Sequence, residues 1–252
     1  MGLLFGGIYM IKTIKGVVIQ ETPWKENSKI LNILTEEGII GVLSKGCKNI
    51  KSDLRLVSQK LAYGEFIILE GNSSLATLKE GNIINPLVRI NSDLTLISYY
   101  TYITELVTQI MKQNLDSEIY NLYIKTILKI EDGFDPMVMM NILEIKLLDF
   151  LGVGITLNAC VKCGSTKNII TVDPDVGGYV CSNCYTNEII YDEAVRKMLR
   201  MYYLVDIDSV SEIKIKDYVK ESINQFLSIY YDRYTGIYIY SKKFLANIVD
   251  FK

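Results

Sequence analysis

The fold is decided early in this 252-residue chain, by residues 11–44, which read IKTIKGVVIQETPWKENSKILNILTEEGIIGVLS. Short runs rich in β-branched and apolar residues alternate here with clusters of Gly, Asn, Ser and Glu, a pattern typical of strands joined by turns. Two further runs follow after a polar connection, so that five are found in all, at 14–19, 30–35, 39–43, 65–69 and 75–78. Five strands in about 75 residues predict a small barrel such as the OB-fold, and an SH3-like barrel fits almost as well.

From Asn91 onward the pattern becomes helical. Apolar residues recur every three or four positions between Leu96 and Ile110, as on the buried face of a helix. The same period predicts further helices at 119–130, 136–151, 192–203 and 215–231. We therefore expect an α+β protein of several domains. Its predicted parts are a leader outside the fold at 1–10, a five-stranded OB-fold barrel at 11–85 and an all-helical domain at 86–252.

Four cysteines form two CxxC pairs, Cys160 with Cys163 and Cys181 with Cys184, separated by residues 164–180. This spacing predicts a zinc ribbon over 158–190, inserted between helices, because two tight turns can aim four thiolates at one tetrahedral ion. Disulfides would require an oxidising compartment, and a thioredoxin-like site would require only one CxxC. Four thiolates leave no position for water, so the single ion would be structural, and iron remains an alternative to zinc.

The amino-acid composition and the motifs that are absent narrow the classes of function open to this chain. The chain has no histidine, which excludes Ser-His-Asp and Cys-His nucleophile systems and the HExxH metalloproteases. It also lacks a phosphate-binding GxxxxGK[ST] loop and a GxGxxG loop, so we expect no enzyme. No apolar run is long enough for a membrane span, and no signal peptide is recognisable, which favours the cytoplasm.

Charge is unevenly distributed. The 27 basic and 29 acidic residues give a formal net charge of −2, so any attraction to nucleic acid must be local. Residues 45–60 carry such a local excess, with five basic side chains and only Asp53 as an acid. A solvated loop would explain this run as well. Its place between strands of a predicted OB-fold favours a nucleic-acid interface, because folds of this kind bind single strands on their face and loops.

Several segments together resemble the RecO family of bacterial recombination mediators, in its zinc-bearing branch. The resemblance covers nearly the whole chain from about residue 11 and depends on the order and spacing of the segments. Two departures are Asn27-Ser28, where the family has Ser-Asp, and Tyr240, where it has a basic residue. The matching segments are GVVI at 16–19, ENSKIL at 26–31, TEEG at 35–38, LSKGCK at 43–48, LEIKLL at 143–148, the cysteine pairs with their glycines, and SKKFL at 241–245.

The resemblance implies a non-enzymatic DNA-binding protein with an OB-fold and a zinc-bearing helical domain. Such proteins bind single- and double-stranded DNA, anneal complementary strands and, with RecR, help load RecA onto DNA coated by the single-stranded-DNA-binding protein. It implies a cytoplasmic, nucleoid-associated protein. The alternative that the residues leave open is a zinc-ribbon adaptor that acts only through protein–protein contacts.

The resemblance also directs the choice of binding residues. We expect phosphate contacts from Lys45, Lys48 and Lys51, followed by Lys29 and Arg55. Trp24 could stack on a base or pack against the barrel. A second basic group could extend the DNA track, meet the acidic tail of the single-stranded-DNA-binding protein or simply be solvated; its members are Arg196, Lys197, Arg200, Lys242 and Lys243.

Overall fold

The computed structural model describes residues 9–211 and 215–250. Most of the predicted leader lies outside these residues, and Met10 already belongs to the first strand. The chain divides into two compact units. The first comprises the chain up to Asp93 together with 111–120, and the second comprises 94–110 and the chain from Asn121 onward.

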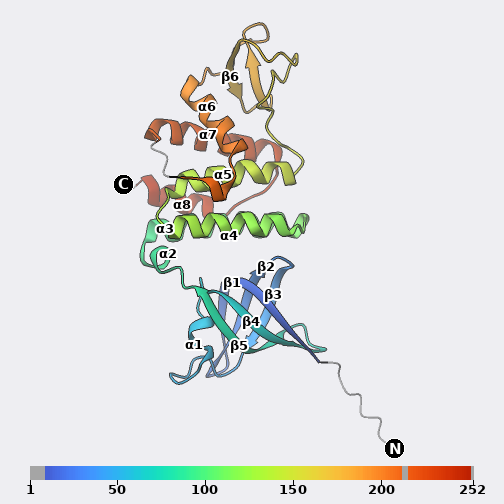
Figure 1. The fold of residues 1–252 in the computed structure, drawn as a ribbon, viewed down its shortest axis with the longest axis vertical. Helices are drawn as coiled ribbons and strands as arrows, with labels where there is room; N and C mark the ends of the chain where they lie inside the picture. The colour runs from blue at the N-terminus through green and yellow to red at the C-terminus, as the bar shows by residue number, and fades with distance from the viewer. Residues whose placement is uncertain (1–8, 212–214, 251–252) are drawn as a thin grey trace, which may run out of the picture. The chain divides into compact units, whose positions relative to one another are not determined.

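The first unit contains a closed five-stranded barrel with the strand order β1-β2-β3-β5-β4 (Figure 1). The five strands predicted from the sequence are confirmed. They are β1 (Met10–Trp24), β2 (Ser28–Thr35), β3 (Gly38–Ser44), β4 (Tyr63–Glu70) and β5 (Ala76–Asn85). Neighbouring strands are antiparallel except β3 and β5, whose short parallel pairing joins Val42 to Ala76 and Leu43 to Thr77 and closes the barrel.

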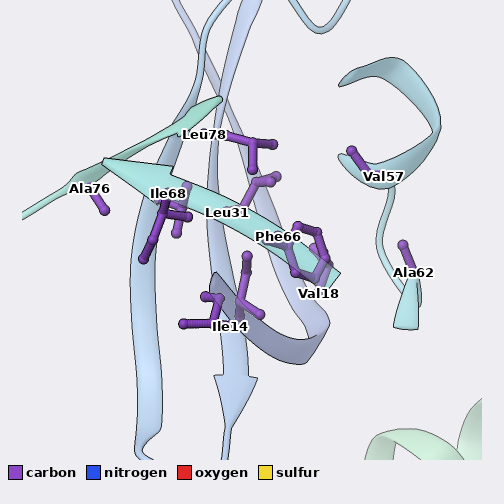
Figure 2. Close-up of a cluster of buried hydrophobic side chains, with 11 residues drawn as sticks. Ile14, Val18, Leu31, Val57, Ala62, Phe66, Ile68, Ala76 and Leu78 are labelled. Carbon is purple, nitrogen blue, oxygen red and sulfur yellow. The ribbon is translucent and has the colours of Figure 1, made fainter. Parts of the chain in front are cut away.

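The barrel interior is filled by alternate residues of the strands, because successive strand side chains point to opposite faces. Figure 2 shows Leu31, Phe66 and Ile68 within this cluster, all fully buried. Val57 joins the cluster from the short helix α1 (Leu54–Val57), between β3 and β4. A Cβ atom at Gly81 would lie 3.0 Å from a Val57 methyl carbon, so the missing side chain at position 81 makes room for α1.

The second unit is helical, as predicted, apart from the cysteine segment. The predicted helices are α3 (Leu94–Gln113), α4 (Ser117–Glu131), α5 (Pro136–Phe150), α6 (Glu193–Leu204) and α7 (Asp217–Tyr234). Residues 111–120, at the end of α3 and the start of α4, belong to the first unit, as does short α2 (Val88–Ser92), which precedes α3. The structure adds the 3₁₀ turn η1 (Ile207–Ser209) and a helix that the periodicity did not predict, α8 (Ser241–Asp250). Between α5 and α6 lies a two-stranded hairpin, β6 (Ile169–Asp173) and β7 (Gly178–Cys181).

Helix α5 is the centre of this unit and packs against α6 and α7. Asp135 caps it by accepting hydrogen bonds from the N–H groups of Met137 and Val138, with Pro136 in the first turn. Most of its side chains are buried, charged Glu144 included. None of the helices in the described ranges has the length and apolar character that crossing a membrane requires.

Glu144 is a buried carboxyl with an unusual proton affinity. Burial raises its pKa from 4.5 to about 7, although the Tyr102 hydroxyl donates a hydrogen bond to it and Lys242 is close enough to lower the pKa. The Tyr231 hydroxyl donates to the Glu144 backbone oxygen at 2.8 Å. Between pH 4.5 and about 7 the folded chain therefore holds a proton at Glu144 that the unfolded chain has lost.

We expect the free energy of unfolding to fall as the pH rises through this window, by about 3 kcal/mol from this group, and then to level off. Urea unfolding of the full chain at several pH values measures the fall. Glu144→Gln should remove this part of the pH dependence, whereas Glu221→Gln, at an exposed position on α7, should retain it. If Glu144→Gln unfolds with the pH profile of the wild type, the buried carboxyl does not titrate as described.

Candidate nucleic-acid interface and metal centre

A loop whose two ends meet carries the predicted phosphate-binding residues. We call residues 45–57, which include α1, the lysine loop. Ser44 and Ser58 flank it, and their hydroxyl oxygens lie 2.8 Å apart in a buried hydrogen bond. Cys47 is 1% exposed and anchors the loop as a small buried residue. Compact loops of about 6–16 residues with adjacent ends are often functional.

The turn between β1 and β2 is hydrogen-bonded to the lysine loop. The Lys48 N–H donates to the Asn27 carbonyl at 3.1 Å, and the Gly46 N–H donates to the Ser28 hydroxyl at 3.2 Å. These bonds place the end of β1 beside the loop, and with it Trp24, which is 45% exposed. The structure thus places Trp24, the predicted stacking residue, beside the loop that carries the predicted cations.

The lysine loop keeps its cations available. Lys45, Lys51 and Arg55 are exposed and Lys48 is half-buried. Considering only the described residues, no carboxylate lies within 4.0 Å of any of these four cationic groups. Lys48 donates a hydrogen bond to the Lys25 carbonyl at 3.5 Å. Four positive groups without ion pairs on one short loop give the positive local potential that a phosphate backbone needs.

Among the described residues, Lys29 has an ion pair, unlike the four cations of the lysine loop. Its side chain is 11% exposed, and its ammonium nitrogen lies 2.8 Å from a Glu21 carboxylate oxygen. It also donates to the Ser58 carbonyl at 3.3 Å, and so it supports the base of the lysine loop. A phosphate contact from Lys29, in addition to these bonds, stays a prediction.

Some side chains of the second predicted basic group already have hydrogen-bond or ion-pair partners. Arg196 donates to the carbonyl of Ile169, and Lys197 pairs with a carboxylate one helical turn away at 2.8 Å. Lys242 pairs with Asp232 at 3.0 Å. Arg200 and Lys243 are exposed, and neither has an ion pair among the described residues.

The four cysteines of the ribbon segment converge on one point. Their sulfur atoms all lie within 4.8 Å of one another, and those of Cys163 and Cys181 are 3.7 Å apart. A disulfide would need about 2.05 Å. Four thiolates about 2.3 Å from a tetrahedral ion are spaced about 3.8 Å from one another. The arrangement therefore fits one metal ion held by four thiolates.

The local backbone explains how the cysteines are placed. The Gly164 N–H donates to the Cys160 carbonyl at 2.8 Å, and the Cys184 N–H donates to the Cys181 carbonyl at 3.0 Å, so each CxxC closes a turn. Gly164 has a φ of +74° and Gly177 one of +88°. Both values lie in the left-handed region that glycine enters most easily.

The pKa values of the cysteine thiols also favour a metal cation between the four sulfur atoms. Burial raises the pKa of Cys160, but N–H donors led by that of Cys181 more than offset this and lower it to about 6. The hydrogen bond that the Cys184 thiol donates to Cys163, together with burial and the neighbouring sulfurs, raises the pKa of Cys184 to about 12. All four sulfurs can be thiolates together only when a positive ion lies between them.

Comparison with known proteins identifies the class. Residues 10–87 match the family model described as "Recombination protein O N terminal", and residues 91–243 match the one described as "Recombination protein O C terminal". A barrel and a helical unit with these two matches define a DNA repair protein.

The chain belongs to the RecO family. It is 32% identical over 239 residues to the DNA repair protein RecO of Listeria innocua, covering 93% of each chain. It is 30% identical over 248 residues to that of Bacillus pumilus, covering 96% of each. It is 32% identical over 248 residues to that of Bacillus cytotoxicus, covering 96% of this chain and all of the relative.

Proposed function

We propose that this protein is a non-enzymatic recombination mediator that binds single- and double-stranded DNA and anneals complementary strands. With RecR, it would help load RecA onto DNA coated by the single-stranded-DNA-binding protein, in the cytoplasm at the nucleoid. The observation that carries the proposal is the closed lysine loop with its four unpaired cations beside Trp24. The closed five-stranded barrel supports the assignment to the OB-fold, which commonly binds oligonucleotides.

The mechanism requires no bond making. Phosphates of one strand lie against Lys45, Lys48, Lys51 and Arg55 and release their counterions. Because the positive loop offsets the charge of the bound strand, a complementary strand approaches against weaker repulsion. Trp24 offers a flat apolar face for one base, and stacking of this kind is independent of sequence. Exposed Arg200 and Lys243 would serve the acidic tail of the single-stranded-DNA-binding protein.

For the four-cysteine centre we propose one structural zinc ion. Cys160, Cys163, Cys181 and Cys184 would hold it and fill its coordination sphere. When bound, the ion neutralises the thiolates and fixes the insert around the β6–β7 hairpin. It has no open position for water, so it supplies no catalysis.

A salt titration of the wild-type chain tests the DNA proposal. If all four loop cations contact phosphates, the logarithm of the binding constant should fall against the logarithm of salt concentration with a slope of about 2.8 on single strands and about 3.6 on duplex. Fluorescence anisotropy with labelled oligonucleotides gives both slopes. A strand-annealing assay with and without the single-stranded-DNA-binding protein tests the mediator role. Absence of DNA binding at low salt would overturn the proposal and favour the protein-only adaptor.

A further inference from the structure

Two large apolar side chains project from the lysine loop into solvent. Ile50 is 85% exposed, the highest value for any large apolar side chain in the described part of the protein, and Leu56 is 72% exposed. They alternate along the loop with the unpaired cations, Ile50 between Lys48 and Lys51 and Leu56 next to Arg55. Single exposed apolar residues are common on protein surfaces, but here two lie on one short, positively charged loop.

The positive charge and the apolar side chains of the lysine loop together limit the kinds of molecule that could bind over Ile50 and Leu56. Ammonium and guanidinium groups without ion pairs select a partner with regularly spaced negative charge, whereas Ile50 and Leu56 select one with apolar surface. Single-stranded DNA carries both, because unstacked bases expose their faces close to the phosphates. A duplex offers the same phosphates but keeps its base faces stacked inside the helix.

We propose that Ile50 and Leu56 contact the exposed base faces of single-stranded DNA and make the lysine loop prefer single strands to duplex. The inference rests on the proposed DNA binding and adds to it the residues that distinguish the two forms of DNA. The cations bind the phosphates of either form, whereas the two aliphatic side chains gain contact only with unpaired bases. This contact does not depend on base identity, since every base has an apolar face.

The test uses the full-length chain with Ile50→Ser, Leu56→Ser and the double variant. Both positions are exposed, so the fold should not depend on either, and thermal unfolding confirms this for each variant. Ile11→Ser is the matched control, because Ile11 is 70% exposed but lies at the other end of β1 from Trp24, near Glu70 of β4. Binding is measured by anisotropy on an oligothymidine and on a hairpin duplex at several salt concentrations.

We expect the double variant to bind the oligothymidine about tenfold more weakly at every salt concentration, with an unchanged salt slope. Its duplex affinity should stay within about twofold of the wild type, as should both affinities of Ile11→Ser. Unchanged affinity of the double variant for the single strand, or an equal loss on duplex, overturns the inference while the proposed DNA binding stands. A wild-type chain that binds neither DNA overturns both.

Discussion

Replacing Lys45, Lys48 and Lys51 together by glutamate is expected to weaken DNA binding by about 100-fold or more at low salt. Three positive groups of the lysine loop become negative and would repel the phosphates that the proposed interface places against them. The salt slope should fall by about 2 on single strands and by about 2.7 on duplex, because each lost phosphate contact removes about 0.7 or 0.9. Oligonucleotides of different sequence should lose affinity equally, because phosphate contacts carry no sequence information.

The matched control makes the same change of net charge elsewhere in the same unit. Lys15, Lys79 and Lys112 are exposed, and over the described ranges none of them has a carboxylate within 4.0 Å. Their triple replacement by glutamate should cost far less affinity, because only the overall charge of the protein changes. If both triple variants bind equally, or if the loop variant binds as the wild type does, the interface does not lie on the lysine loop.

Loss of the proposed metal ion is expected to have the largest effect on structure. Binding a structural zinc ion contributes about 10–16 kcal/mol to folding in small zinc domains. Cys163→Ser should therefore abolish metal binding and unfold the segment 158–190, while the helices around α5 retain their own core. Elemental analysis should show about one metal equivalent in the wild type and almost none in the variant. Limited proteolysis should cut the variant within 158–190 first.

Cys47→Ser is the control for this experiment. It removes a buried thiol of the lysine loop, far along the chain from the four ligands, and should leave the metal content unchanged. Wild-type protein purified without added metal that contains less than about half an equivalent would contradict a closed four-thiolate site. A full equivalent of iron would confirm the site and correct the identity of the ion.

The sequence predicts the parts of the fold that are determined locally. The β-branched runs correctly locate all five strands, and Asp135-Pro136 marks the start of α5 because its cap is a property of adjacent residues. Closure of the barrel has no such signal. It depends on the parallel pairing of Val42 with Ala76 and of Leu43 with Thr77, which are far apart in the chain. Helix α8 is short, so its period is hard to recognise.

The metal centre and the lysine loop also differ in how much of each can be predicted from the sequence. A metal ion imposes a fixed spacing on its ligands, so the two CxxC pairs indicate the centre from the sequence alone. For the cations, the sequence gives charge but not pairing. In the sequence, Lys29 cannot be distinguished from the lysines of the loop. The register of the β1–β2 hairpin places it opposite Pro23 and near Glu21. Ser44 and Ser58 carry no pattern at all, although their hydrogen bond shapes the loop.

That hydrogen bond has a consequence for how the loop of this protein can be altered. Because Ser44 and Ser58 join the two ends of the loop, changes of charge at its exposed positions leave the strand ends where they are, provided that Cys47 and Val57 stay buried. The charge at the exposed positions of the loop can therefore be redesigned, for weaker or stronger attraction to polyanions, without rebuilding the barrel.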